Sequence, residues 1–308
     1  MAQIDYNLRP AKHIERVMLA QALRRLSPFG SVESYRYVGF GAAYYRDFRL
    51  FHRDLGITNM LSIEQDIANQ IRYEFNVPFS CVTTIFGYST EILPTLDWDV
   101  RTILWLDYTG KLGRDMLADA ALFVTNCVPG SVLIVTVNVQ ADQLNQDPLN
   151  RLKERVGAEN VPQHISTAQL TGWGLSGVCR RIMRNKLDET LVARNGPRDA
   201  GARLQFHQLF NFEYADDAKM LTFGGLFCEK GQSALVSNCN FNALPFVRND
   251  AEPCRIEVPK LTYREIHHLQ AQFPGDGNHI DRHGIPEPDV DRFRNVYRYF
   301  PVFAPTEI

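Results

Sequence analysis

The 308-residue sequence has little charge imbalance, few cysteines and no long apolar run. Its 33 Lys and Arg residues nearly match its 35 Asp and Glu residues, and a net charge of −2 provides no general attraction to nucleic acid. Apolar stretches such as Ser131–Val139 are shorter than the roughly 20 residues that a membrane-spanning helix needs, and the N-terminus has no apolar signal core. We expect a cytoplasmic protein with no membrane contact.

The six cysteines are too scattered for the closely paired ligands of a zinc site. Cys228 and Cys239 are the closest two, so we expect reduced and mostly buried thiols. His279 and His283 have the spacing of a ligand pair, but no second pair of Cys or His accompanies them. A solvated loop is therefore favoured over a metal site, and we assign no metal.

Short apolar runs alternate with longer amphipathic ones, which is typical of strands joined by crossover helices. Near-continuous apolar strands indicate a parallel sheet that is covered on both faces. The expected strands are Tyr35–Phe40, Asn59–Ile63, Cys81–Phe86, Thr102–Asp107 and Ser131–Asn138, and the expected helices between them are Tyr44–Leu55, Ile67–Phe75 and Gly113–Val124.

Two later strand-like segments, Leu204–Tyr214 and Lys219–Glu229, are separated only by turn residues and predict an antiparallel hairpin. The segment 140–202 before them is too long for a simple crossover, and we interpret it as a helical insertion. Thr262 and Glu265 form a capping box, which predicts a helix after Thr262. The remainder is expected to be a largely irregular tail with one short helix near Val290.

This order of elements resembles the sheet of the class I S-adenosylmethionine-dependent methyltransferases, an α/β fold with a doubly wound, mostly parallel sheet and a C-terminal antiparallel hairpin. The resemblance extends over Tyr35 to Glu229. It divides the chain into an N-terminal helical segment, 1–33, a Rossmann-like domain, 34–230, and a C-terminal extension, 231–308. It also implies S-adenosylmethionine as the cofactor.

The first strand-to-helix junction contains Gly39, Phe40 and Gly41, where glycine permits a sharp turn and a close approach by a cofactor. Methyltransferases usually have an acidic residue at position 37 and a third glycine at position 43, whereas this chain has Tyr37 and Ala43. A plain tight turn explains the two glycines about as well.

Carboxylate and polar residues follow the next two strands. Glu64 ends the second strand about 25 residues after Gly39, close to the spacing of the carboxylate that binds both ribose hydroxyls. The resemblance implies that the turn of Gly87, Tyr88 and Ser89 binds the adenine. Alternatively, Glu64 caps the next helix and the turn merely starts one.

The fourth strand ends in Asp107, Tyr108 and, shortly after, Lys111. This segment resembles the acidic-aromatic strand end of methyltransferases that act on amines. The resemblance implies that Asp107 orients the nucleophile, that Tyr108 packs against the substrate and that Lys111 binds an anionic group. The alternative is a helix-capping acid beside a core tyrosine.

Two clusters of basic residues are either phosphate-binding sites or ordinary solvent-exposed faces. They are Arg9, Lys12 and Arg16 near the N-terminus, and Arg180, Arg181, Arg184 and Lys186 in the insertion. Together with VGFGAAYYRDFRLF, the segment Leu8–Arg16 is similar to one uncharacterised bacterial group of O-methyltransferases. That resemblance suggests a role in antiviral defence.

The leading hypothesis is methyl transfer from S-adenosylmethionine to a small or nucleotide-like acceptor. One alternative is a catalytically degenerate nucleotide-binding or scaffold subunit of a defence complex. Another is an enzyme that cleaves a nucleotide with Glu64 or Asp107 as nucleophile or base. We also expect a surface for a protein partner or a second copy in the C-terminal extension, formed by Phe293, Tyr297, Tyr299 and Phe300.

Overall fold

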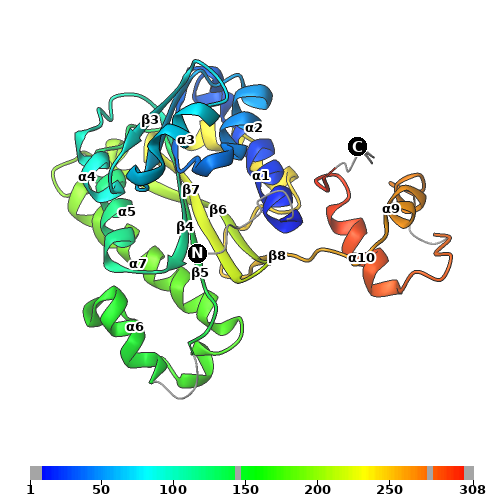
Figure 1. Cartoon of the computed structure of the whole chain (residues 1–308). Coiled ribbons are helices and arrows are strands. Elements are labelled where there is room, and N and C mark those ends of the chain that lie inside the picture. Colours follow the sequence, from blue (N-terminus) through cyan, green and yellow to red (C-terminus); the bar gives the residue numbers. More distant parts are fainter. Residues whose placement is uncertain (1–8, 143–146, 276–279, 302–308) are drawn as a thin grey trace.

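The computed structural model describes residues 9–142, 147–275 and 280–301 and contains an eight-stranded sheet (Figure 1). The strand order is β3-β2-β1-β4-β5-β7-β6-β8. Strands β1 to β5 pair in parallel, whereas β7 is antiparallel to both β5 and β6, which confirms the predicted doubly wound sheet with its hairpin. The strands are β1 (Arg36–Gly39), β2 (Asn59–Glu64), β3 (Val82–Phe86), β4 (Thr102–Lys111), β5 (Val132–Asn138), β6 (Leu204–Ala215), β7 (Lys219–Glu229) and β8 (Cys254–Ile256).

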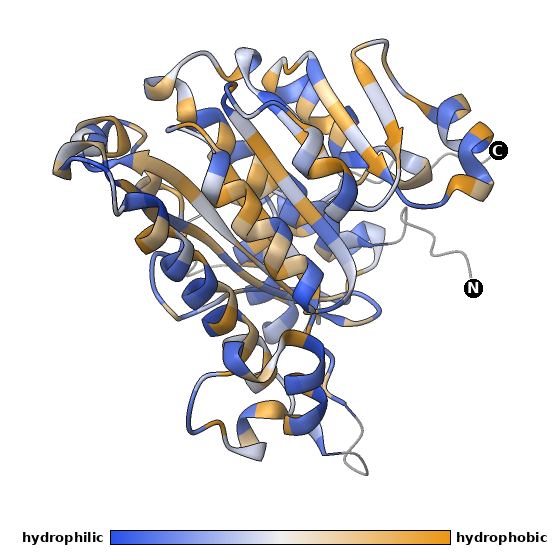
Figure 2. Ribbon diagram, turned by 90° about the vertical axis from the view of Figure 1, so that its left-hand side faces the viewer, coloured by the Kyte–Doolittle hydropathy of each residue, from blue (hydrophilic) through white to orange (hydrophobic). Residues whose placement is uncertain are grey.

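Alternate residues of the central strands contribute to two separate hydrophobic cores. In β4, Ile103 and Trp105 belong to one core, and Leu104 and Leu106 belong to the other. Successive side chains of a strand point to opposite faces, so each face of the sheet has its own core. Figure 2 shows the apolar residues gathered along the strands and on the inner sides of the helices.

Helices α1 (Pro10–Leu23) and α2 (Arg46–Leu55) cover one face, and α5 (Arg114–Asn126) and α7 (Gly174–Asn195) cover the other (Figure 1). Helix α6 (Pro148–Val156) and α7 form the predicted helical insertion between β5 and β6. The shorter α4 (Ser89–Ile92) follows β3.

Helix α3 (Gln70–Asn76) lies beside the edge strand β3 and buries none of its residues. Its side chains Ile71 and Phe75 are more than four-fifths exposed. The apolar spacing of this segment predicts a helix correctly, but it does not predict that the apolar residues remain uncovered.

The C-terminal extension contains α8 (Ser233–Asn238), α9 (Tyr263–Gln270) and α10 (Glu287–Val296) in addition to β8. The capping box is present, because Glu265 accepts a hydrogen bond of 2.6 Å from the Thr262 amide. The short strand β8, which pairs with β6, is not predicted from the sequence.

The aromatic side chains expected to form a partner surface are buried. Phe293, Tyr299 and Phe300 belong to the same core as α1 and α2, and Tyr297 packs against it. The expectation of an exposed aromatic surface on the tail is therefore wrong, because these rings anchor the extension to the rest of the chain. The Phe246 and Tyr299 rings, for example, meet edge to face at 5.6 Å.

The cysteines form no disulfide, and Cys127, Cys179, Cys228 and Cys239 are buried, as the sequence predicts. Within residues 9–142, 147–275 and 280–301, no helix combines the length and the apolar character that a membrane span requires.

Candidate functional site

The carboxyl ends of β1, β2, β3 and β4 meet at one edge of the sheet, where ligands bind in open α/β folds. At the end of β1, a Cβ added to Gly39 would lie 2.5 Å from the Tyr37 hydroxyl. A Cβ added to Gly41 would lie 2.5 Å from the Tyr45 ring and 2.8 Å from the Ser62 hydroxyl. Both glycines are therefore required by side chains of the chain itself.

Replacing Gly41 by alanine is expected to lower the free energy of unfolding by about 1–3 kcal/mol, because Tyr45 is buried and cannot move aside freely. Urea denaturation measures the change. Gly177 is the matched control, because an added Cβ on this exposed position of α7 has no neighbour within 4 Å. Gly177→Ala is expected to raise the free energy of unfolding by about 0.5–1 kcal/mol, because alanine favours a helix more than glycine does. A Gly41→Ala variant as stable as the wild type would contradict the packing argument.

Glu64 lies at the end of β2 and is almost fully buried. Its Oε1 accepts hydrogen bonds from the Ala42 amide at 2.7 Å and from the Ser62 hydroxyl at 3.0 Å. Burial raises the pKa of Glu64 to about 7, although both hydrogen bonds favour the ionised form. A carboxylate that is held beside the β1 loop and titrates near neutrality is typical of a functional position.

The turn after β3 lies next to Glu64, since the Gly87 amide donates a hydrogen bond of 2.9 Å to the Glu64 carbonyl. Gly87 has a φ of +154°, which favours glycine. The Tyr88 side chain is 60% exposed. Ser89 begins α4, as the alternative interpretation of this turn expects. Burial raises the pKa of Asp119, although a hydrogen bond with the Ser89 hydroxyl opposes that shift.

Asp107, near the end of β4, forms an ion pair with a buried lysine of α1. The Lys12 ammonium lies 2.6 Å from Asp107 Oδ1, 2.7 Å from Glu15 Oε2 and 3.1 Å from the Tyr214 hydroxyl. It also lies 4.6 Å from the centre of the Trp105 ring, a cation–π contact. The Asp107 side chain is 22% exposed, whereas those of Lys12 and Glu15 are almost fully buried. Of the two carboxylates bound to Lys12, Asp107 is thus the one that solvent can reach.

More buried charges surround this ion pair. Glu15 also accepts a hydrogen bond from the Thr222 hydroxyl, and burial raises the Glu15 pKa. Asp47 accepts a hydrogen bond from the Tyr37 hydroxyl, and burial raises its pKa as well. Arg16 is 8% exposed, and its Nε has no hydrogen-bond partner among the described residues. Such clustering of buried ionisable groups is typical of functional sites.

The sequence predictions for this cluster were incomplete. The sequence predicts that Lys12 and Arg16 bind phosphate or face solvent, whereas the structure buries both. Glu15, Asp47 and Tyr214 were missed. One available signal is that Lys12 and Glu15 lie among apolar residues at a spacing of three, at which opposite charges pair on a helix, so both can be buried together.

Tyr108 points to the opposite face from Asp107. Its hydroxyl donates a hydrogen bond of 2.6 Å to Asp119 of α5, and its ring meets Phe40 edge to face at 5.2 Å. Burial raises the Tyr108 pKa well above its usual range. Lys111 forms an ion pair of 2.5 Å with Asp142, so any anionic ligand of Lys111 has to compete with that carboxylate.

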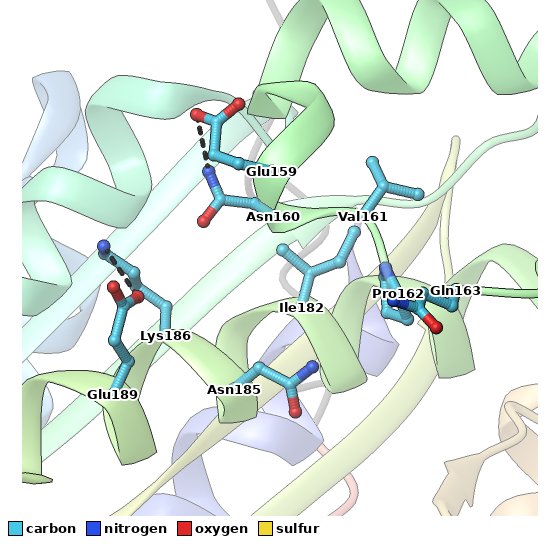
Figure 3. Close-up of a pocket in the computed structure, with 9 residues that line it drawn as sticks. All are labelled: Glu159, Asn160, Val161, Pro162, Gln163, Ile182, Asn185, Lys186 and Glu189. Atoms are coloured by element: carbon cyan, nitrogen blue, oxygen red, sulfur yellow. Dashed lines mark hydrogen bonds and ion pairs between the residues drawn. The ribbon is translucent and has the colours of Figure 1, made fainter.

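A separate cavity of about 310 Å³ lies between α7 and the segment before it (Figure 3). Its lining is mostly polar and includes Asn160, Asn185 and Lys186, while Lys186 already pairs with Glu189. None of the residues predicted to bind cofactor or substrate lines this cavity.

A model of the family described as "Putative O-methyltransferase" matches residues 4–308. The chain belongs to this O-methyltransferase family. No curated protein sequence matches it. Its structure is similar to that of the O-methyltransferase TomG from Streptomyces achromogenes, involved in tomaymycin synthesis and solved with S-adenosylmethionine, at 17% identity and a TM-score of 0.38 over 68% of this chain and 78% of TomG.

A further similar structure is the N-methyltransferase NodS from Bradyrhizobium japonicum in complex with S-adenosylhomocysteine. It is 11% identical, with a TM-score of 0.41 over 73% of this chain and 93% of NodS.

The residues at the sheet edge of this O-methyltransferase family member fit a donor that contains a ribose. Glu64 is a buried hydrogen-bond acceptor beside the β1 loop, as ribose hydroxyls require. The turn after β3 lies next to it, and Asp107 approaches the same edge from β4. The fit of the β1 loop is weaker, because Tyr45 and Ser62 occupy the space beside Gly41.

Proposed function

We propose that the protein catalyses methyl transfer from S-adenosylmethionine to a hydroxyl group of a small or nucleotide-like acceptor. One observation carries the proposal: a partly exposed carboxylate, Asp107, is fixed by a buried lysine at the same sheet edge as Glu64. A hydroxyl acceptor must lose a proton when it gains a methyl group, so the site needs a base at the acceptor position.

Each residue of the site has a distinct role in this proposal. S-adenosylmethionine, when bound, supplies an electrophilic methyl group on a positively charged sulfur. Glu64 binds the ribose hydroxyls, and Gly87, Tyr88 and Ser89 surround the adenine. Asp107 accepts the proton of the acceptor hydroxyl through its exposed edge, while the ion pair with Lys12 keeps its carboxylate oriented.

The remaining site residues have supporting roles. The Tyr108 ring, packed on Phe40, forms a wall on the other side of β4, and we keep its packing against the substrate as a prediction. Lys111 and Arg16 are candidates to bind an anionic group of the acceptor; Lys111 already pairs with Asp142, whereas Arg16 Nε has no hydrogen-bond partner among the described residues. A cytoplasmic location and a role in antiviral defence also stay predictions.

A second candidate function is a nucleotide-binding or scaffold subunit without catalysis. The β1 loop favours it, because Gly39 and Gly41 make room for the side chains of Tyr37 and Tyr45. Calorimetry with S-adenosylmethionine, S-adenosylhomocysteine and common nucleotides separates the candidates. Binding of the donor, followed by transfer of a radiolabelled methyl group to a mixture of nucleotides, bases, transfer RNA and cell extract, supports the enzyme. Donor binding without labelling, or binding of nucleotides alone, supports the second candidate.

Donor affinity is expected to depend on pH through Glu64. Ribose hydroxyls bind the ionised carboxylate, and the pKa of Glu64 in the free protein is about 7. Affinity for S-adenosylhomocysteine should therefore rise with pH, by up to about tenfold per unit below pH 7, and level off above it. Calorimetry between pH 5.5 and 8.5 measures this dependence, because the range extends about one to two pH units on either side of the Glu64 pKa.

Glu64→Gln is the companion variant in that experiment, because it keeps the side-chain shape and removes the ionisation. We expect it to bind S-adenosylhomocysteine about 1.5–3 kcal/mol more weakly at high pH and to lose the pH dependence. Equal affinity of folded variant and wild type at pH 8 would show that Glu64 does not contact the donor.

A further inference from the structure

We propose a binding site for a divalent transition-metal ion, with zinc as the favoured ion, formed by His268, Asp281 and His283 in the C-terminal extension. One ligand atom from each of these residues lies within 4.8 Å of the other two. His268 comes from α9, whereas Asp281 and His283 belong to the segment before α10. The site is thus assembled by the fold from two parts of the chain.

The donor atoms are already grouped around one point. The His268 and His283 rings have centroids 4.5 Å apart, and His283 Nδ1 lies 2.7 Å from Asp281 Oδ1. Ligand atoms that lie about 2.0–2.2 Å from a tetrahedral zinc ion are roughly 3.4 Å apart, so the hydrogen-bonded Asp281 and His283 side chains have to separate slightly to bind one ion. Asp281 and His283 are more than half exposed, which leaves them free to make this movement.

The hydrogen bonds around His268 orient its ring for metal binding. His268 Nε2 lies 2.7 Å from the Asp281 carbonyl oxygen and 3.0 Å from the Gln272 side-chain nitrogen. We assign the ring proton to Nε2, which then donates to the carbonyl. That tautomer leaves the lone pair on Nδ1, and a backbone carbonyl that binds the second ring nitrogen is the usual support of a metal-binding histidine. Gln272 reinforces the arrangement, because its side chain bonds both the Asp281 amide and the Asp281 carbonyl.

The charge near the cluster permits a cation. Asp281 supplies a negative charge, and its Oδ1 accepts a hydrogen bond of 3.2 Å from the His283 amide. The adjacent Arg282 pairs with Glu287 at 3.2 Å, so its charge is partly compensated. Two imidazoles and one carboxylate leave the fourth position for water, and this donor set suits zinc better than the all-oxygen preference of calcium or magnesium.

The sequence predicted no metal here, since His279 and His283 had no partner pair. The structure supplies that partner from α9, which the spacing could not reveal. His279 itself lies outside the described residues and is not part of the proposal. A bound ion would join α9 to the segment before α10, and it would stabilise the extension by binding only its folded form.

The test is titration of the untagged, metal-free chain with zinc chloride in a calorimeter, and with cobalt(II) chloride in a spectrophotometer. We expect one zinc ion per chain, the intense visible absorption of four-coordinate cobalt(II), and a higher melting temperature with zinc. His268→Ala and His283→Ala should each weaken zinc binding at least about tenfold, because each removes a ligand.

His267→Ala is the matched control, since His267 neighbours His268 on α9, is exposed, and contacts the Tyr263 ring instead of the cluster. It should bind zinc like the wild type. Two outcomes overturn the proposal: no binding by the wild type at millimolar zinc, or the same affinity in a His268→Ala/His283→Ala double variant. The substituted positions are at least partly exposed, and circular dichroism without metal checks that each variant is folded.

Discussion

Replacing Lys12 by methionine is expected to lower the free energy of unfolding by about 3–5 kcal/mol, the scale for breaking a buried ion pair from one side. Methionine fills much of the same volume but leaves Glu15 buried without its cation. Urea denaturation followed by circular dichroism measures the loss. Because burial raises the pKa of Glu15 above its unfolded value, protonation favours the folded state, so the deficit should be smaller at low pH and grow as pH rises.

Lys186→Met is the control for this variant. Lys186 pairs with Glu189 on the surface of α7, where the carboxylate is 70% exposed, so the change should stay within about 0.5–1 kcal/mol. If Lys12→Met lowers the free energy of unfolding by less than about 1 kcal/mol, water reaches Glu15, and the ion pairs of the cluster are not shielded from solvent.

Asp107→Asn is expected to reduce methyl transfer by about 10² or more, because an amide cannot take the acceptor proton. Affinity for the donor should stay within about tenfold. The fold should be retained, since Lys12 keeps Glu15 and the Tyr214 hydroxyl as partners. Single-turnover transfer of labelled methyl, with an acceptor found in the mixture described above, measures the effect. Tyr108→Phe should be milder, because the ring remains against Phe40.

The control for Asp107→Asn is Asp188→Asn, which removes a carboxylate from an exposed ion pair with Arg184 on α7. Its transfer rate should equal that of the wild type. If Asp107→Asn also transfers methyl at the wild-type rate, Asp107 serves only as the counter-ion of Lys12, and another group has to accept the proton.

The sheet and its edge were predictable because they follow from local patterns. Buried parallel strands are continuous apolar runs, and their carboxyl ends must meet at one edge, so the ends of β2 and β4, which carry Glu64 and Asp107, lie at the same edge of the sheet. Side chains alternate between the two faces of a strand, so the neighbours Asp107 and Tyr108 must face opposite sides of the sheet. The resemblance to an acidic-aromatic strand end instead assigns both residues to the substrate.

The contribution of α1 was not predictable, because periodicity identifies the inner face of a helix without showing which strands it covers. Lys12 meets Asp107 only because α1 packs over this face of the sheet. The tail was misread for a related reason. Phe293 and Phe300 occur among Pro, Asp and Arg residues, and local composition cannot show that distant core residues enclose them.

The position of α1 bears on when the site can form during synthesis. Helix α1 leaves the ribosome well before β7, and it contributes Glu15, whose partner Thr222 lies 207 residues later in the chain. The Ala11 amide at its start likewise bonds Asp216, 205 residues away. Chains are made at about 5–20 residues per second, so Lys12 and Glu15 have to wait for at least about ten seconds before β7 exists. Until then Lys12 and Glu15 lack some of the partners that they have in the folded protein. The surroundings of Asp107, the proposed catalytic carboxylate, are therefore completed late in folding.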